Sequence, residues 1–153
     1  MTIHSTMISG YRALEEMVYL LPGDSHVLLL TDKNIRTIPA VQRLLTTIET
    51  ASSLVTIIDS VPPEPSQHDV ARVLQEVAEA QVDMVIGIGG GSVLDVAKLM
   101  SVLCADNAPS LAALLAGEKP IKRTRSLLIP TTAGTGSEAT PNAILALPEQ
   151  ETK

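Results

Sequence analysis

Apolar residues in this chain follow two alternating patterns, short continuous runs and longer stretches with helical spacing. Continuous runs of aliphatic residues are typical of strands that are buried on both faces of a sheet. The sequence predicts such strands at residues 26–31, 54–58, 84–86 and 126–129, with a candidate fifth strand at 142–147 and a candidate edge strand within 1–9.

Apolar residues that recur every three or four positions predict amphipathic helices. This spacing indicates helices at residues 10–21, from near 38 to 48, at 70–77, at 93–105 and, as a short helix, at 110–116. Pro39 marks the start of the second helix, because proline is tolerated only in a first turn. Ser66 and Asp69 have the capping-box spacing and mark the start of the third.

The alternation of strands and helices predicts an α/β fold. Right-handed crossovers between parallel strands place helices on both faces of the sheet. The length of 153 residues suits one domain, residues 1–153. Ligands of such sheets bind beyond the carboxyl ends of the strands, so the loops that directly follow the predicted strands form the candidate site.

The stretch 82–98, VDMVIGIGGGSVLDVAK, contains the most unusual of these loops. It predicts a buried strand, a turn with glycines at 87 and 89–91, and a helix. Ser92 and Asp95 have the capping-box spacing. A helix N-terminus presents free N–H groups and partial positive charge, and glycines let an anion approach closely. We interpret the turn as a phosphate or pyrophosphate cradle, with a tight turn that binds nothing as the alternative.

Three further loops follow predicted strands and are expected to meet the glycine turn at one edge of the sheet. The carboxylate of Asp32 suits either the hydroxyls of an adenosine ribose or a helix N-cap, and the residue alone does not decide between them. Glu64, in the proline loop VPPEP, is interpreted as a solvated acid. The hydroxyl-rich stretch 130–140 suits a phosphate, a ribose or a carboxamide, with a flexible surface linker as the alternative.

Charge and motifs exclude several classes of protein. A formal net charge of −6 argues against a nucleic-acid surface, which requires a basic stripe. The sequence has no GxxxxGK[ST], HExxH or CxxC motif, and its three histidines lack metal-ligand spacing. The common GxGxxG fingerprint is not met either, since Leu94 stands where its third glycine should be. Without a membrane-spanning run or a signal peptide, we expect a cytoplasmic protein.

Three motifs carry a resemblance to a known family. They are TDK at residues 31–33, GIGGGSVLDVAK at 87–98 and IPTTAGTGSEAT at 129–140. In the residues, order and approximate spacing of these motifs, the chain resembles the N-terminal domain of the iron-containing (group III) alcohol dehydrogenases. The resemblance implies a Rossmann-like parallel sheet, with helices on both faces, that binds a nicotinamide dinucleotide.

The resemblance also implies roles for particular residues. Asp32 would hold the adenosine ribose and favour NAD over NADP, because a carboxylate repels a 2′-phosphate. Gly90, Gly91 and Ser92 would wrap the pyrophosphate, and Asp95 would lie near the nicotinamide side. The rest of the cofactor groove would be formed by Thr131, Thr132, Thr135, Thr140, Ile144 and Lys153. Glu64 stands where the family usually has Asn, and no cofactor contact is assigned to it.

Members of the family continue into an all-helical C-terminal domain that supplies an Asp and three His as ligands of iron, or sometimes zinc. Those positions do not occur in this sequence, so we expect it to lack that domain, a bound metal and catalytic residues of its own. The resemblance implies the NAD-binding portion of an enzyme that interconverts an alcohol and an aldehyde or ketone. We expect the chain, truncated relative to the family, to be inactive alone.

Two other interpretations remain open. The chain is alternatively a non-catalytic nucleotide-binding or assembly module. It is also a candidate homo-oligomer, because helices that would pack on a C-terminal domain expose apolar surface. No nucleic-acid or membrane partner is expected in either case.

Overall fold

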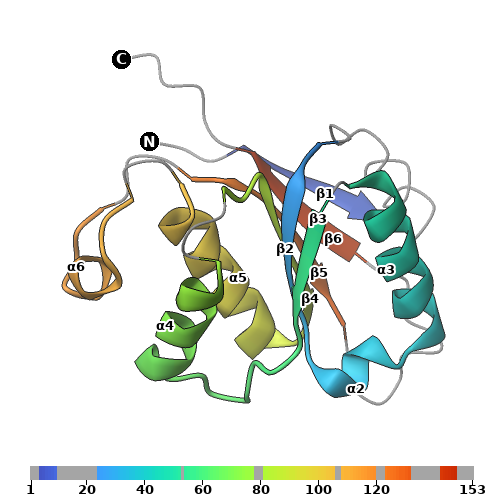
Figure 1. The fold of residues 1–153 in the computed structure, drawn as a ribbon, viewed down its shortest axis with the longest axis horizontal. Helices are drawn as coiled ribbons and strands as arrows, with labels where there is room; N and C mark the ends of the chain where they lie inside the picture. Colours follow the sequence, from blue (N-terminus) through green and yellow to red (C-terminus); the bar gives the residue numbers. More distant parts are fainter. Residues whose placement is uncertain are drawn as a thin grey trace.

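The structure is a computed structural model that describes residues 4–9, 24–52, 54–77, 81–105, 108–119, 123–131 and 142–147. Within these residues the chain forms a six-stranded sheet in the order β1-β6-β5-β4-β2-β3 (Figure 1). The strands are β1 (His4–Ser9), β2 (His26–Leu30), β3 (Leu54–Ile58), β4 (Met84–Gly89), β5 (Arg125–Pro130) and β6 (Asn142–Leu147). The helices are α2 (Lys33–Arg36), α3 (Pro39–Ala51), α4 (Gln67–Glu76), α5 (Gly91–Leu103) and α6 (Leu111–Leu115).

The strands at the four predicted aliphatic runs, β2, β3, β4 and β5, pair in parallel, as the alternation of strands and helices predicted. Strand β2 lies between β3 and β4, and β4 pairs with β5. Strand β6 is antiparallel to β5, and β1 is antiparallel to β6. This antiparallel pair at the edge was not predicted, because β1 and β6 stand at opposite ends of the chain.

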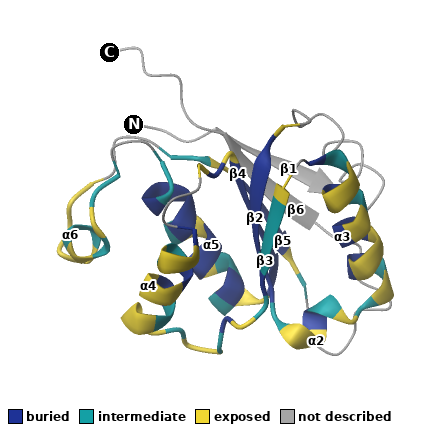
Figure 2. Cartoon of the chain, viewed as in Figure 1, coloured by how far each residue is buried: buried dark blue, intermediate teal, exposed yellow. Residues whose placement is uncertain are grey.

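The apolar side chains form two layers, one on each face of the sheet. Val27 and Leu29 of β2 face the cluster that contains α3, whereas Leu28 and Leu30 face the cluster that contains α4 and α5. Successive residues of a strand point to opposite faces, so a continuous apolar run serves both layers. Figure 2 shows the buried residues concentrated in β2, β4 and the inward sides of the helices. The prediction of an α/β sheet with helices on both faces is confirmed.

Two predicted helix starts are confirmed. Helix α3 has Ile38 as its N-cap and Pro39 in its first turn. The N-cap of α4 is Ser66, and this residue forms a complete capping box with Asp69.

The predicted capping box of Ser92 and Asp95 is wrong. Helix α5 begins at Gly91 with Gly90 as its N-cap, and no side chain within the described ranges caps it. Ser92 is therefore already inside the helix. The predicted helix at 10–21 falls outside the described residues.

Candidate functional site

The carboxyl ends of β2, β3, β4 and β5 lie side by side at one edge of the sheet. The backbone N–H of Thr131, just after β5, donates to the carbonyl of Gly89 at 3.0 Å. Just after β2, the backbone N–H of Thr31 donates to the carbonyl of Ile58 at 2.9 Å, and its hydroxyl donates to the carbonyl of Ile88 at 2.8 Å. These bonds bring the loops that follow all four parallel strands to the same rim.

The glycine turn between β4 and α5 contains glycines with different structural roles. A Cβ on Gly87 would lie 2.7 Å from the Cβ of Ala97, so this glycine lets α5 pack closely on β4. A Cβ on Gly90 or Gly91 would meet nothing within 4 Å among the described residues. As far as the described residues extend, the space beside these two glycines is open at the positive end of a 13-residue helix. An anion can approach the backbone N–H groups of that end directly.

The proline loop contacts the glycine turn through one hydrogen bond. The backbone N–H of Glu64 donates to the hydroxyl of Ser92 at 3.2 Å. Glu64 has φ of +62°, a left-handed conformation that destabilises a residue other than glycine by roughly 1 kcal/mol or more. Since the Ser92 oxygen accepts this bond, its own proton remains able to point toward a ligand. Sequence reasoning missed this contact because it joins loops 28 residues apart.

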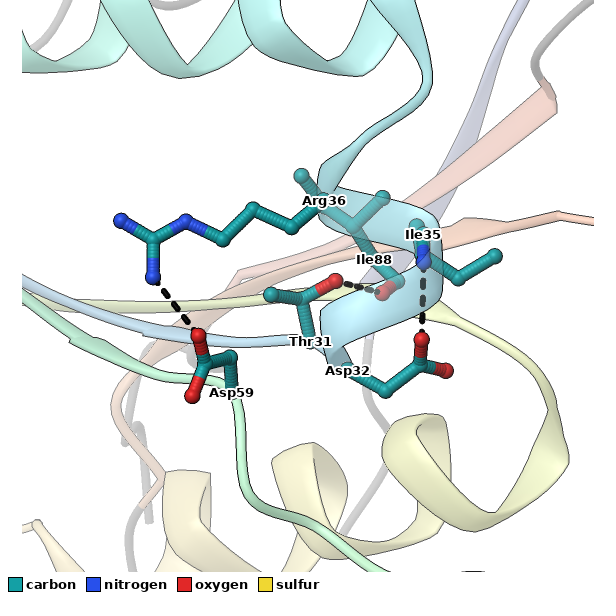
Figure 3. Close-up of polar contacts among 6 residues, drawn as sticks. All are labelled: Thr31, Asp32, Ile35, Arg36, Asp59 and Ile88. Atoms are coloured by element: carbon teal, nitrogen blue, oxygen red, sulfur yellow. Dashed lines mark hydrogen bonds and ion pairs between the residues drawn. The ribbon is translucent and has the colours of Figure 1, made fainter.

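Asp32 serves as the N-cap of α2. Its Oδ1 accepts the backbone N–H of Ile35 at 2.8 Å, as Figure 3 shows. Asp32 also forms an isolated antiparallel bridge with Ser60, at the end of the neighbouring strand. One carboxylate oxygen is used for the cap, which leaves the other available to a hydroxyl. Both uses considered from the sequence are therefore compatible.

An ion pair beside Asp32 was also missed. Arg36, at the end of α2, donates to Oδ2 of Asp59 at 2.8 Å (Figure 3). Asp59 directly follows β3, so the rule that selected Asp32 from its place after a strand would have found this acid as well.

Thr131 carries a buried hydroxyl that could bond with a ligand. Its hydroxyl oxygen is buried and has no hydrogen-bond partner within the described part of the chain. A buried hydroxyl of this kind normally has a partner, and leaving it without one destabilises the fold. The open glycine turn and this hydroxyl together suit a group with several acceptor oxygens, such as a dinucleotide.

The structure describes the remaining predicted site residues only in part. Asp95 is 77% exposed on α5 and lies 4.0 Å from the ammonium of Lys98. Ile144 lies on β6 opposite Leu128 in the strand register, and its side chain is outside what the structure describes. Thr132, Thr135, Thr140 and Lys153 fall outside the described residues.

His26 and Cys104 are potentially reactive side chains, but their surroundings indicate structural roles. His26 is buried, and its ring nitrogens bond with the Thr56 hydroxyl at 2.9 Å and the Gln81 carbonyl at 3.3 Å. Burial raises the pKa of the Cys104 thiol to about 11, so this residue is not a thiolate at neutral pH. Across the described ranges, no three His, Cys, Asp or Glu side chains are grouped to hold a metal ion. None of the helices in those ranges is long and apolar enough to cross a membrane.

Two hollows on the surface lie away from the strand ends. One of 530 Å³ lies between α4 and α6, and one of 470 Å³ lies along α3. Neither is lined by Asp32, Thr131 or a residue of the glycine turn.

Comparison with known proteins identifies the family of this chain. A family model described as "Iron-containing alcohol dehydrogenase" matches residues 5–153. The chain is 33% identical over 143 residues to long-chain-alcohol dehydrogenase 1 of Geobacillus thermodenitrificans, covering 90% of this chain and 36% of the relative. It is 31% identical over 153 residues to an alcohol dehydrogenase of Thermococcus barophilus, covering 94% of this chain and 40% of the relative.

Solved structures give the same result. The fold is similar to an iron-containing alcohol dehydrogenase of Thermotoga maritima, with a TM-score of 0.65 and 32% identity, covering 80% of this chain and 34% of that one. A sulfoacetaldehyde reductase of Bifidobacterium kashiwanohense in complex with NAD+ has a TM-score of 0.64 and 25% identity, covering 84% and 34%. The chain thus spans between 34% and 40% of the length of these four proteins. The resemblance of the three motifs is confirmed: the chain belongs to the iron-containing alcohol dehydrogenase family, whose members are oxidoreductases.

Proposed function

We propose that this chain is the NAD-binding portion of a metal-dependent alcohol dehydrogenase, which interconverts an alcohol and an aldehyde or ketone by hydride transfer. The observation that carries the proposal is the N-terminus of α5, which no side chain of the described residues caps or covers beside Gly90 and Gly91. It lies at the same rim as Asp32 and the buried hydroxyl of Thr131. The relative solved in complex with NAD+ supports the same class of ligand.

Each group at the rim has a binding task in this proposal. The N–H groups at Gly91 and Ser92 donate to the pyrophosphate oxygens, and the Ser92 hydroxyl adds its own proton. The second carboxylate oxygen of Asp32 accepts the ribose hydroxyls and disfavours a 2′-phosphate, which selects NAD over NADP. The bound dinucleotide supplies the hydride acceptor or donor at its nicotinamide.

The remaining predicted site residues complete the groove in this proposal. The groove beyond Asp32 and the glycine turn is formed by Asp95, Thr131, Thr132, Thr135, Thr140, Ile144 and Lys153. We also propose that iron or zinc does not bind to this chain, since its described residues do not fit a metal site. In the proposed enzyme, the substrate is a small alcohol or aldehyde. It would meet the cofactor only at a site that holds the metal.

Isothermal titration of the 153-residue chain with NADH and NADPH tests the proposal. We expect NADH to bind and NADPH to bind more weakly. Gly91→Val places a branched side chain in the open space and should abolish binding of both dinucleotides. Ala71→Val, on the exposed side of α4, is the matched control and should leave binding unchanged. Absence of NADH binding to the folded wild-type chain would overturn the proposal.

A turnover assay tests the proposed inactivity of the chain alone. With NAD+, added Fe²⁺ or Zn²⁺ and either ethanol or propanediol, we expect no formation of NADH at 340 nm. Appreciable turnover by the 153 residues would contradict this part of the proposal and would show that they hold a metal.

A further inference from the structure

The ion pair between Arg36 and Asp59 lies where the ends of β2 and β3 meet. The guanidinium Nη1 donates to Oδ2 of Asp59 at 2.8 Å, and the two side chains are 43% and 26% exposed. The Asp32–Ser60 bridge and the bond from Thr31 to Ile58 hold the two strand ends together beside the pair. The contact therefore joins loops that the fold holds in fixed positions.

The pair determines the direction of the guanidinium. Figure 3 shows Arg36 extended toward Asp59, on the side of α2 opposite to the carboxylate of Asp32. Asp32 caps this helix and Arg36 ends it, so the two residues stand one turn apart. The stem of Arg36 is long and flexible enough to turn either way, and Asp59 holds it in one of the two directions.

Resting on the proposed function, we propose that Asp59 determines the specificity of the site by withholding the Arg36 guanidinium from a 2′-phosphate of the adenosine ribose. A phosphate near Asp32 meets a carboxylate and needs a cation to offset it. Arginine suits phosphate because its planar donors form two parallel hydrogen bonds. While Arg36 is paired with Asp59, that interaction is absent and the site favours a ribose with free hydroxyls. Asp59 is thus a positioning residue that acts through Arg36.

Two small probes isolate this effect from the rest of the dinucleotide. Adenosine 2′,5′-bisphosphate and 5′-AMP differ only in the 2′-phosphate, and isothermal titration gives the affinity of each. Asp59→Ala should raise the affinity for the bisphosphate by about tenfold, as expected for one new charge-assisted interaction. The affinity for 5′-AMP should change by less than about twofold, because that probe lacks the added phosphate.

Two variants control for the change in charge. Glu49→Ala removes one negative charge from the exposed side of α3 and should leave both affinities unchanged. The double variant Asp59→Ala with Arg36→Gln should lose the gain in bisphosphate affinity, because the gain requires the guanidinium. Lys33, also next to Asp32, is unchanged in every variant and contributes equally to all of them.

The outcomes separate this inference from the proposed function. Failure of the wild-type chain to bind either probe or NADH would overturn both. Normal binding of 5′-AMP with an unchanged bisphosphate affinity in Asp59→Ala would overturn only the role of Asp59. A gain that also occurs in Glu49→Ala, or that persists in the double variant, would do the same, because it would come from net charge and not from Arg36.

Discussion

Two strand-to-helix turns at the same rim treat the free N–H groups of their helices in opposite ways: one caps them with a side chain and the other does not. After β2, the side chain of Asp32 accepts an N–H of α2 and so caps the helix from within the chain. After β4, Gly90 has no side chain, and among the residues that the structure describes none caps α5 through its side chain. In the proposed function, the first turn presents a carboxylate to the dinucleotide, whereas the second presents backbone N–H donors and partial positive charge.

The start of α4 shows what a helix with no such role looks like. Ser66 and Asp69 satisfy each other's backbone groups in a complete capping box, so two of the free N–H groups at this helix start already have partners within the chain. The difference teaches that the N-terminus of a helix indicates a binding role when its side-chain cap is missing. Five variants at four positions break or sharpen this comparison.

The largest effect is expected from Gly87→Ala, which changes the packing behind the open turn. The new Cβ would lie 2.7 Å from the Cβ of Ala97, so α5 must move away from β4. Overpacking of this kind destabilises a fold by about 1–3 kcal/mol. Urea unfolding followed by circular dichroism measures the loss of stability. A midpoint equal to that of the wild type would show that the helix moves without destabilising the fold.

Asp32 separates capping from ligand binding. Asn caps a helix about as well as Asp, so Asp32→Asn should leave stability within about 0.5 kcal/mol of wild type. Its affinity for NADH should fall by about tenfold or more, since hydrogen bonds to a charged group are the stronger ones. Asp32→Ala should lose the same affinity and also about 1 kcal/mol of stability. Equal stability of the two variants in urea would show that the cap contributes nothing.

Gly91→Ala should change stability and ligand binding in opposite directions at the open turn. Alanine is a better helix former than glycine and meets no neighbour here, so the variant should gain up to about 1 kcal/mol. Its methyl group would narrow the approach of an anion and weaken NADH binding. Unfolding and titration of one preparation measure both changes. Unchanged binding would place the phosphates elsewhere.

The smallest effect concerns the closed cap of α4 and its pH dependence. The backbone N–H and the hydroxyl of Ser66 bond to Asp69 and lower the pKa of its carboxyl from 3.8, with a smaller contribution from Arg72. The folded state thus favours the charged form, and this stabilisation is present above pH 3.8 and lost as the pH falls through the folded pKa. Ser66→Ala removes the hydroxyl bond but keeps the backbone N–H, so it should reduce in part the decline in stability as the pH falls below 3.8. An unchanged slope in acid unfolding would contradict it.

Local patterns predicted the elements and the kind of site. Runs such as 26–31 and 84–86 predicted buried strands because aliphatic side chains on both faces suit a covered parallel sheet. Pro39 and the pair of Ser66 and Asp69 predicted helix starts, since caps depend on neighbours three residues away. The start of α5 was misplaced because Ser92 and Asp95 have the right spacing, yet the helix already begins at Gly91.

The sequence by itself determined the family, the parallel strands and the glycine-rich turn, because each follows from residues that are close together along the chain. Only the tertiary structure decided which loops meet. It placed β2 between β3 and β4, paired β6 with β1, and joined Glu64 to Ser92 and Arg36 to Asp59. Such contacts link residues many positions apart. They depend on how the strands order themselves around two apolar layers, which no local spacing encodes.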